Sequence, residues 1–206
     1  MKILLTGFDP FGGEEVNPSL EAVKHVTAPP GAELIKLEVP TVFGASIDAV
    51  LKAMRQHRPG AVVCVGQAAG RAGITPERVA INIADASLPD NAGNQPCDEL
   101  IYPDGDAAYF STLPVKAMVA AIQAAGLPAS LSNTAGTFVC NQLLYGVLYH
   151  IKKEFPNTLG GFLHVPCLPE QAKRMGKELP TLPLTDIVSA LEAALTVLVS
   201  RQSGTI

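Results

Sequence analysis

The run AVVCVG, residues 61–66, constrains the fold of this 206-residue chain most, because it has no polar face. A strand that meets water on one side alternates apolar and polar residues, whereas a strand covered on both faces is apolar throughout. Residues 2–6, KILLT, form another short apolar run, and it ends in the turn-rich segment GFDPFGG. Both runs predict buried strands of a parallel or mostly parallel sheet.

Segments with helical spacing alternate with the strand-like runs along the chain. We expect strands at 2–6, 33–39, 61–66, 77–85, 128–132 and 160–166, and helices at 17–26, 44–57, 114–125, 138–155 and 185–201. This alternation predicts an α/β fold, a three-layer α/β/α sandwich around a mostly parallel twisted sheet, in a single domain over residues 1–206. In such sheets the functional residues gather at the carboxyl ends of the strands.

The composition narrows the choice of partner and compartment. With 48% hydrophobic residues the chain can bury one sizeable core, and its formal net charge of −4 makes nucleic acid an unsuitable partner. The apolar runs are too short for a signal peptide or a membrane-spanning helix, so we expect a cytosolic protein with no membrane partner. The cysteines at 64, 97, 140 and 167 form no CxxC pair, and we expect free thiols.

Residues 86–112 form an unusually long connection that is rich in proline, asparagine, aspartate and glycine. A connection of this length inside a compact domain is usually functional or mobile. We expect it to serve as a lid or to contribute to an interface.

Cys140 is the strongest candidate nucleophile, because it is expected in the first turn of the helix at 138–155. Unpaired backbone N–H groups at a helix start stabilise a thiolate and can also bind an oxyanion. The alternative is a small apolar residue that packs the helix against the sheet, as most buried cysteines do.

His164 is the histidine best placed to act as the base, since it ends the strand predicted at 160–166. His25 and His57 lie near helix ends beside charged residues, and His150 is about 15 Å along the helix of Cys140. Glu77 is a candidate for the acid that orients the imidazole. From the residues alone, Glu77 is no better a candidate than Asp85 or Asp90.

Eight motifs spread along the chain carry a more specific signal. They are LLTGFDPFGG, VNPS, VPTVFGAS, CVGQAAGR, ITPERVAIN, PDNAGNQP, TAGTFVCNQLLYG and GGFLHVPCLPEQA, in this order. Up to about residue 172 the chain resembles the pyrrolidone carboxyl peptidases, or pyroglutamyl peptidases of type I. After about residue 173 the likeness is weak, and we expect only a closing helix.

The resemblance implies a cytosolic cysteine peptidase that removes an N-terminal pyroglutamyl residue from peptides through a thioester, without a cofactor or a metal. It implies an open α/β/α sandwich, a homotetramer, and a triad of Cys140, His164 and Glu77. The residues that it implies for the substrate pocket are Phe8, Phe11, Thr41, Gln67, Phe138 and Val139.

The chain departs from the family where many members carry an arginine just before the PDN motif, since Ser87 and Leu88 stand there. If that arginine holds the oxyanion, turnover is lower here, or Arg71 or Arg78 substitutes for it; the sequence leaves both open.

Three other functions remain as alternatives. His164 and Cys167 form an HxxC pair for a metal-dependent hydrolase, although a second close ligand pair is missing. A second alternative is a non-catalytic nucleotide- or phosphate-binding domain that uses TGFDPFGG as its glycine-rich loop, although this segment lacks the spacings of nucleotide-binding loops. An esterase or another thiol hydrolase would use the same nucleophile and differ in its preference among blocked substrates.

Overall fold

Four parallel strands and one short antiparallel strand form the central sheet of the computed structural model. Its order is β2 (Glu33–Val39), β1 (Lys2–Phe8), β3 (Ala61–Gln67), β7 (Leu159–Val165) and β4 (Thr75–Pro76), with β4 antiparallel to β7. The structure describes residues 1–202, with side chains up to residue 200, so the last four residues of the predicted 1–206 domain lie outside the described part. The predicted mostly parallel sheet is confirmed.

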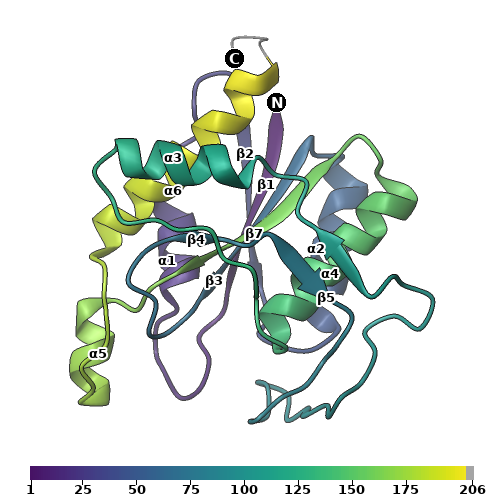
Figure 1. Ribbon diagram of the computed structural model, residues 1–206, viewed down its shortest axis with the longest axis horizontal. Helices are drawn as coiled ribbons and strands as arrows, with labels where there is room; N and C mark the ends of the chain where they lie inside the picture. Colours follow the sequence, from purple (N-terminus) through teal and green to yellow (C-terminus); the bar gives the residue numbers. More distant parts are fainter. Residues whose placement is uncertain (203–206) are drawn as a thin grey trace.

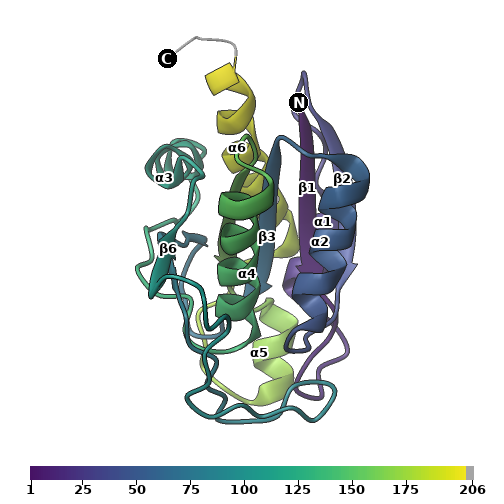
Figure 2. The same ribbon diagram turned by 90° about the vertical axis from the view of Figure 1, so that its right-hand side faces the viewer.

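Helices cover both faces of this sheet and make the predicted three layers (Figure 1). One face carries α1 (Pro18–His25), α3 (Val115–Ala124) and α6 (Leu184–Gln202), and the other carries α2 (Ala45–His57) and α4 (Val139–Glu154). Figure 2 shows α2 and α4 running along the strands, whereas α3 is seen nearly end-on. Each face therefore has its own buried apolar cluster, separated by the sheet.

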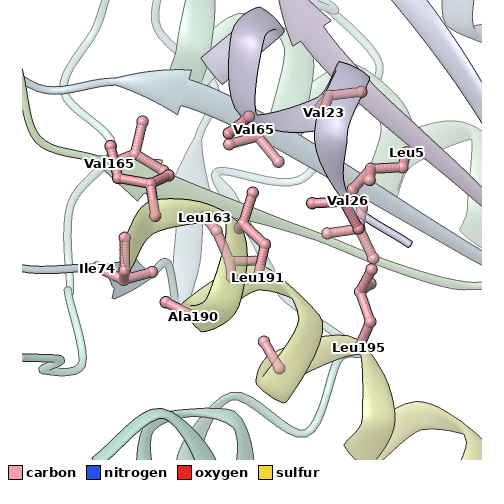
Figure 3. Packing of buried hydrophobic residues seen from close by; sticks show 14 of the residues in the cluster. Leu5, Val23, Val26, Val65, Ile74, Leu163, Val165, Ala190, Leu191 and Leu195 are labelled. Atoms are coloured by element: carbon pink, nitrogen blue, oxygen red, sulfur yellow. The ribbon is translucent and has the colours of Figure 1, made fainter. Parts of the chain in front are cut away.

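Alternate side chains of β7 point to the two faces of the sheet, and the face that carries α6 shows this. Leu163 and Val165 of β7 point into the cluster with Leu191 and Leu195 of α6 (Figure 3). Successive strand residues point to opposite faces, so Phe162 and His164 point toward α4. Phe162 belongs to the cluster on that face and is fully buried.

Two of the predicted strands are wrong. Only Val79–Ile81 (β5) of the segment 77–85 is a strand, and it pairs with β6 (Ala108–Phe110) in a separate antiparallel ribbon. The segment 128–132 makes only isolated bridges, at Ala129 and Ser132. Apolar alternation identifies extended backbone, but it does not identify a partner that lies far along the chain.

Helix α5 (Pro169–Met175) follows β7 and was not predicted from the sequence. It lies beyond the carboxyl ends of the parallel strands (Figure 1). Its seven residues are too few for a helical period, but Pro169 at its start and the left-handed Gly176 at its end are its signals. Among the described residues, no helix is both long and apolar enough to cross a membrane.

Candidate active site

His164 and Glu77 meet at the edge of the sheet. Thr75 of β4 lies opposite His164 of β7, and the Glu77 N–H donates to the Phe162 carbonyl at 2.8 Å. This pairing brings Glu77 Oε1 to 2.7 Å from His164 Nδ1. Because Nδ1 donates to the carboxylate, Nε2 is the nitrogen left to accept a proton.

The other two candidate acids are not at the histidine. Asp85 is exposed. Asp90 is buried and accepts hydrogen bonds from the backbone N–H groups of Phe43, Ala92 and Asn94. Asp90 therefore anchors the long connection to the loop after β2, and Glu77 alone of the three is placed to orient the imidazole.

Cys140 is the second residue of α4, and its thiol lies above a glycine of the neighbouring strand. A Cβ on Gly66 would come within 3.0 Å of Cys140 Sγ, and Gly66 is paired with His164 across β3 and β7. The thiol thus occupies the space that any larger residue at position 66 would fill. The structure therefore places the Cys140 thiol beside the strand position that pairs with His164.

The start of α4 leaves hydrogen-bond donors free beside the thiol. Within the described residues, no group accepts from the backbone N–H groups of Val139, Cys140 or Asn141. The Asn141 side chain is buried and bonds the backbone of Ile81 and Ile83, which fixes the helix start against the β5 segment. The free N–H groups form the donor set that an oxyanion needs.

A pocket of about 290 Å³ opens beside Cys140. Five of the six residues expected to line it do so, namely Phe8, Phe11, Thr41, Gln67 and Phe138. Phe138 contacts the rings of Phe11 and Phe43, each at a centroid distance of 5.2 Å. The walls are therefore flat and mostly apolar, and the pocket lies at the small end of the range for ligand sites.

Val139 does not line the pocket, because its side chain is fully buried in the cluster between α4 and the sheet. Several residues that were not predicted also line the pocket, among them Glu14 and Met175. Arg174 Nη2 lies 2.9 Å from Glu14 Oε2, so an ion pair joins α5 to the loop after β1 at this pocket. No local pattern relates two residues so far apart in the chain.

Gln67 is held by Cys167, one of the predicted free thiols. Its Nε2 lies 3.0 Å from Cys167 Sγ, and Oε1 has no hydrogen-bond partner among the described residues. The described part of the chain contains no group of three residues that could hold a metal ion. The predicted alternative of a His164–Cys167 metal site therefore gains no third ligand.

Burial sets the protonation of the site. It raises the pKa of the Cys140 thiol to about 12, with the Glu77 charge acting in the same direction and the Arg71 charge against it. Burial also lowers the pKa of His164, although the hydrogen bond to Glu77 opposes this. Burial alone would raise the pKa of Glu77, but His164, Ser132 and Arg71 together lower it. Near neutral pH these pKa directions favour a neutral thiol and a neutral imidazole beside an ionised carboxylate, which differs from the thiolate suggested by the helix start alone.

Neither arginine considered as a substitute for the missing family arginine lies free at the oxyanion donors. Arg71 is bound to Glu77 and to the carbonyl of Thr134. Arg78 lines a different surface hollow, beside Leu113 and Pro114. Ser87 is exposed, so the donors that remain beside the thiol are the backbone N–H groups of α4.

Comparisons with known proteins show which family the chain belongs to. The family model for pyroglutamyl peptidase matches residues 1–201, well past residue 172 where the recognisable motifs end. A pyrrolidone-carboxylate peptidase of Lactobacillus johnsonii is 56% identical over 202 residues, which cover 98% of this chain and 94% of that protein. The crystal structure of Bacillus amyloliquefaciens pyroglutamyl peptidase I has a TM-score of 0.91 at 50% identity, with 95% of each chain covered. A mutant pyrrolidone carboxyl peptidase from Pyrococcus furiosus gives a TM-score of 0.93 at 36% identity, over 98% of this chain and 99% of that one. The chain belongs to the pyroglutamyl peptidase family, and it is a cysteine peptidase that removes N-terminal pyroglutamate.

Proposed function

We propose that Cys140, His164 and Glu77 are the catalytic triad of this peptidase and that the 290 Å³ pocket holds the pyroglutamyl ring. The observation that carries the proposal is the buried 2.7 Å bond from His164 Nδ1 to Glu77 at the sheet edge where Cys140 begins α4. The pocket opens on the same thiol. Nucleophile, base, orienting acid and binding site thus share one end of the sheet.

The ring fits the pocket by its size and its neutrality. A five-membered lactam offers two flat faces, one N–H donor and one carbonyl acceptor, and it carries no charge. Phe8, Phe11 and Phe138 supply flat walls, and the free Oε1 of Gln67 can accept the lactam N–H. Cys167 then has a role, since its contact with Nε2 keeps the Gln67 amide turned with Oε1 free.

The first step is acyl transfer to the thiol. As Cys140 Sγ attacks the pyroglutamyl carbonyl carbon, its proton passes to His164 Nε2, and the carbonyl oxygen becomes an oxyanion held by the N–H groups at the start of α4. The imidazolium, stabilised by Glu77, gives its proton to the leaving nitrogen. The C–N bond breaks, and the peptide leaves with a free amino terminus.

The second step regenerates the enzyme. His164 takes a proton from a water molecule that attacks the thioester carbon. The C–S bond breaks, the proton returns to Cys140, and pyroglutamate leaves. No step requires a metal or an organic cofactor.

Hydrolysis of a pyroglutamyl-amide reporter tests this assignment. We expect wild-type turnover to stop after iodoacetamide treatment, and Cys140→Ala to lose it while keeping its melting temperature. Cys97→Ala is the matched control, because Cys97 is an exposed thiol; this variant should keep full activity and still be inactivated by alkylation. Normal turnover by folded Cys140→Ala protein would refute the triad, and equal turnover of prolyl or ester reporters would favour a different thiol hydrolase.

We propose a homotetramer as the working assembly. Leu88, Leu100 and Phe110 are large apolar residues with 45%, 60% and 67% of their surface exposed, and they lie along residues 86–112. Where exposed apolar residues gather into one patch, that patch is typical of a contact surface. Light scattering on the purified protein should give about four times the 21.5 kDa chain mass, and a monomer at micromolar concentration would contradict the proposal.

We also propose that residues 1–206 act as one domain in the cytoplasm. All four cysteines are free thiols, which suits a reducing compartment. Cell fractionation with an antibody against the protein tests the location, and recovery outside the cytoplasm would contradict it.

A further inference from the structure

Arg71 makes three contacts that join separate parts of the site. Its Nη1 lies 2.5 Å from Glu77 Oε1 and also contacts the Thr75 hydroxyl, and its Nη2 donates to the Thr134 carbonyl at 2.9 Å. The Arg71 side chain is 25% exposed, whereas that of Glu77 is fully buried. The guanidinium therefore closes the outer side of a carboxylate whose inner side faces His164.

One carboxylate oxygen serves both the arginine and the histidine. Glu77 Oε1 accepts from Arg71 Nη1 and from His164 Nδ1. A buried carboxylate is strongly disfavoured without a cationic partner, and a neutral imidazole does not supply one. Arg71 is thus the permanent counter-charge of the acid that orients the base.

The third contact extends to the segment that leads to the nucleophile. The Thr134 carbonyl accepts from Arg71 and from the Ser132 hydroxyl, and the Thr137 hydroxyl donates to the Asp85 carbonyl. These hydrogen bonds therefore hold residues 132–137, the segment that precedes α4, in place. A guanidinium can bind the carboxylate and this carbonyl together because its donors spread as a planar fork, which an ammonium group lacks.

We propose that Arg71 is a positioning residue of the peptidase, which holds Glu77 against His164 and ties this pair to the segment that carries Cys140. The proposal rests on the triad of the proposed function. Arg71 contacts neither the substrate pocket nor the thiol, and it acts through Glu77 and Thr134.

The charge of Arg71 gives this role a signature that a purely structural role lacks. The charged groups that act on His164 are Glu77 and Arg71; the same two groups act on Cys140, together with the Cys64 thiol. The positive charge of Arg71 lowers the pKa of His164 and of Cys140. Without it, His164 holds its proton at higher pH, so the acid limb of the kcat/KM profile moves to higher pH.

The experiment compares Arg71→Met and Arg71→Lys with Arg78→Met, which removes the same charge from the residue after Glu77. For Arg71→Met we expect kcat on the pyroglutamyl-amide reporter to fall by about 10- to 100-fold, KM to change less than about twofold, and the acid limb to rise by about one pH unit. Arg71→Lys should restore the acid limb but only part of kcat. Arg78→Met should match the wild type in both.

Alkylation of Cys140 by iodoacetamide, followed by mass spectrometry across pH, provides a second readout that needs no turnover. For Arg71→Met we expect the pH midpoint of this reaction to shift upward. Full activity in Arg71→Met would overturn the proposal, and so would a lower kcat with the pH profiles of kcat/KM and of alkylation both unchanged. Failure of Arg71→Lys to restore the acid limb of the kcat/KM profile would also overturn it. If Arg71→Met does not fold, the kcat of the folded Arg71→Lys variant decides: a kcat below that of the wild type supports the proposal, and an unchanged kcat contradicts it. Failure of the triad is distinguishable, because Cys140→Ala would then retain activity whatever Arg71 does.

Discussion

The Cys140 thiol packs closely against Gly66, and Gly66→Ala tests this arrangement directly. The new Cβ would lie 3.0 Å from Cys140 Sγ and 2.7 Å from Phe162 Cζ. Ordinary contacts between such atoms are about 3.5–4.0 Å, so Sγ must retreat by roughly 0.5–1 Å and the ring by roughly 0.8–1.3 Å. Phe162 is fully buried and its ring centroid lies 4.7 Å from that of His164, so a shift of the ring also disturbs the base.

The expected loss of activity follows from this displacement. A 1 Å misplacement of a reacting group costs up to about 100-fold in rate, so we expect kcat to fall by roughly 10- to 100-fold, or about 1.4–2.7 kcal/mol in the barrier. Overpacking should also lower the free energy of unfolding by about 1–3 kcal/mol. Reporter turnover, the rate of Cys140 alkylation and thermal unfolding measure the three effects separately.

Gly146→Ala is the matched control for overpacking on the same face of the sheet. Its Cβ would come within 2.4 Å of Ile47 Cδ1, two turns along α4 and away from the thiol. We expect a similar loss of stability with kcat within about twofold of the wild type. If Gly66→Ala behaves like this control, with turnover and alkylation unchanged, then Cys140 does not rest on Gly66 and the placement of the nucleophile is wrong.

Three further predictions concern the pocket and the charges. Phe138→Ala removes the ring that contacts Phe11 and Phe43, and kcat/KM on the pyroglutamyl reporter should fall by about 10-fold or more, mainly through KM; an unchanged KM would contradict its place in the wall. The folded-state pKa of His164 lies below its ordinary 6.5, so its contribution to stability is complete above pH 6.5 and is lost as the pH falls toward the lower folded value. Chemical unfolding of wild type and His164→Gln across pH 4–8 should therefore show that the free energy of unfolding falls more steeply toward acid pH in the wild type. Parallel pH dependences of the two proteins would contradict this prediction. Arg174→Met leaves the Glu14 carboxylate without its ion pair at the pocket, so the kcat/KM of a prolyl reporter relative to that of the pyroglutamyl reporter should rise by about 10-fold. The control is Arg55→Met, at the Arg55–Glu154 surface pair, which should leave this ratio unchanged. An unchanged ratio in Arg174→Met would contradict this role of Glu14.

The fold was predictable where local pattern determines structure. The runs at 2–6 and 61–66 are buried strands, and Asn17 caps α1 through a 3.1 Å bond from the Ser19 N–H, because these features depend on neighbours in the chain. The segment 77–85 was misread because most of its backbone hydrogen bonds go to partners far away. The Asn82 N–H, for example, donates to the Ala107 carbonyl, and the Ala84 N–H donates to the Glu99 carbonyl. A short apolar segment does not reveal such partners.

The site was predictable in its residue types and not in its protonation. The position of Cys140 at a helix start and of His164 at a strand end followed from the pattern, and Glu77 followed only from the likeness to the family. The depth of burial that raises the pKa of Cys140 to about 12 depends on how Gly66 and Phe162 pack against the thiol. That packing is a property of the assembled layers, so the sequence alone suggested a thiolate where the structure favours a thiol.

The arrangement of charges explains how a buried thiol can still react. At rest, Glu77 is negative and Arg71 positive, while Cys140 and His164 are neutral, so the four groups sum to zero. In the proposed mechanism, transfer of the thiol proton to His164 creates a thiolate and an imidazolium, and the sum stays zero. The site therefore separates charge without taking up an ion or a proton from water, and Glu77 lies next to the imidazolium that forms. Removal of Arg71 would leave the same proton transfer to occur in a set with a net negative charge, in which the new thiolate is opposed by an uncompensated carboxylate.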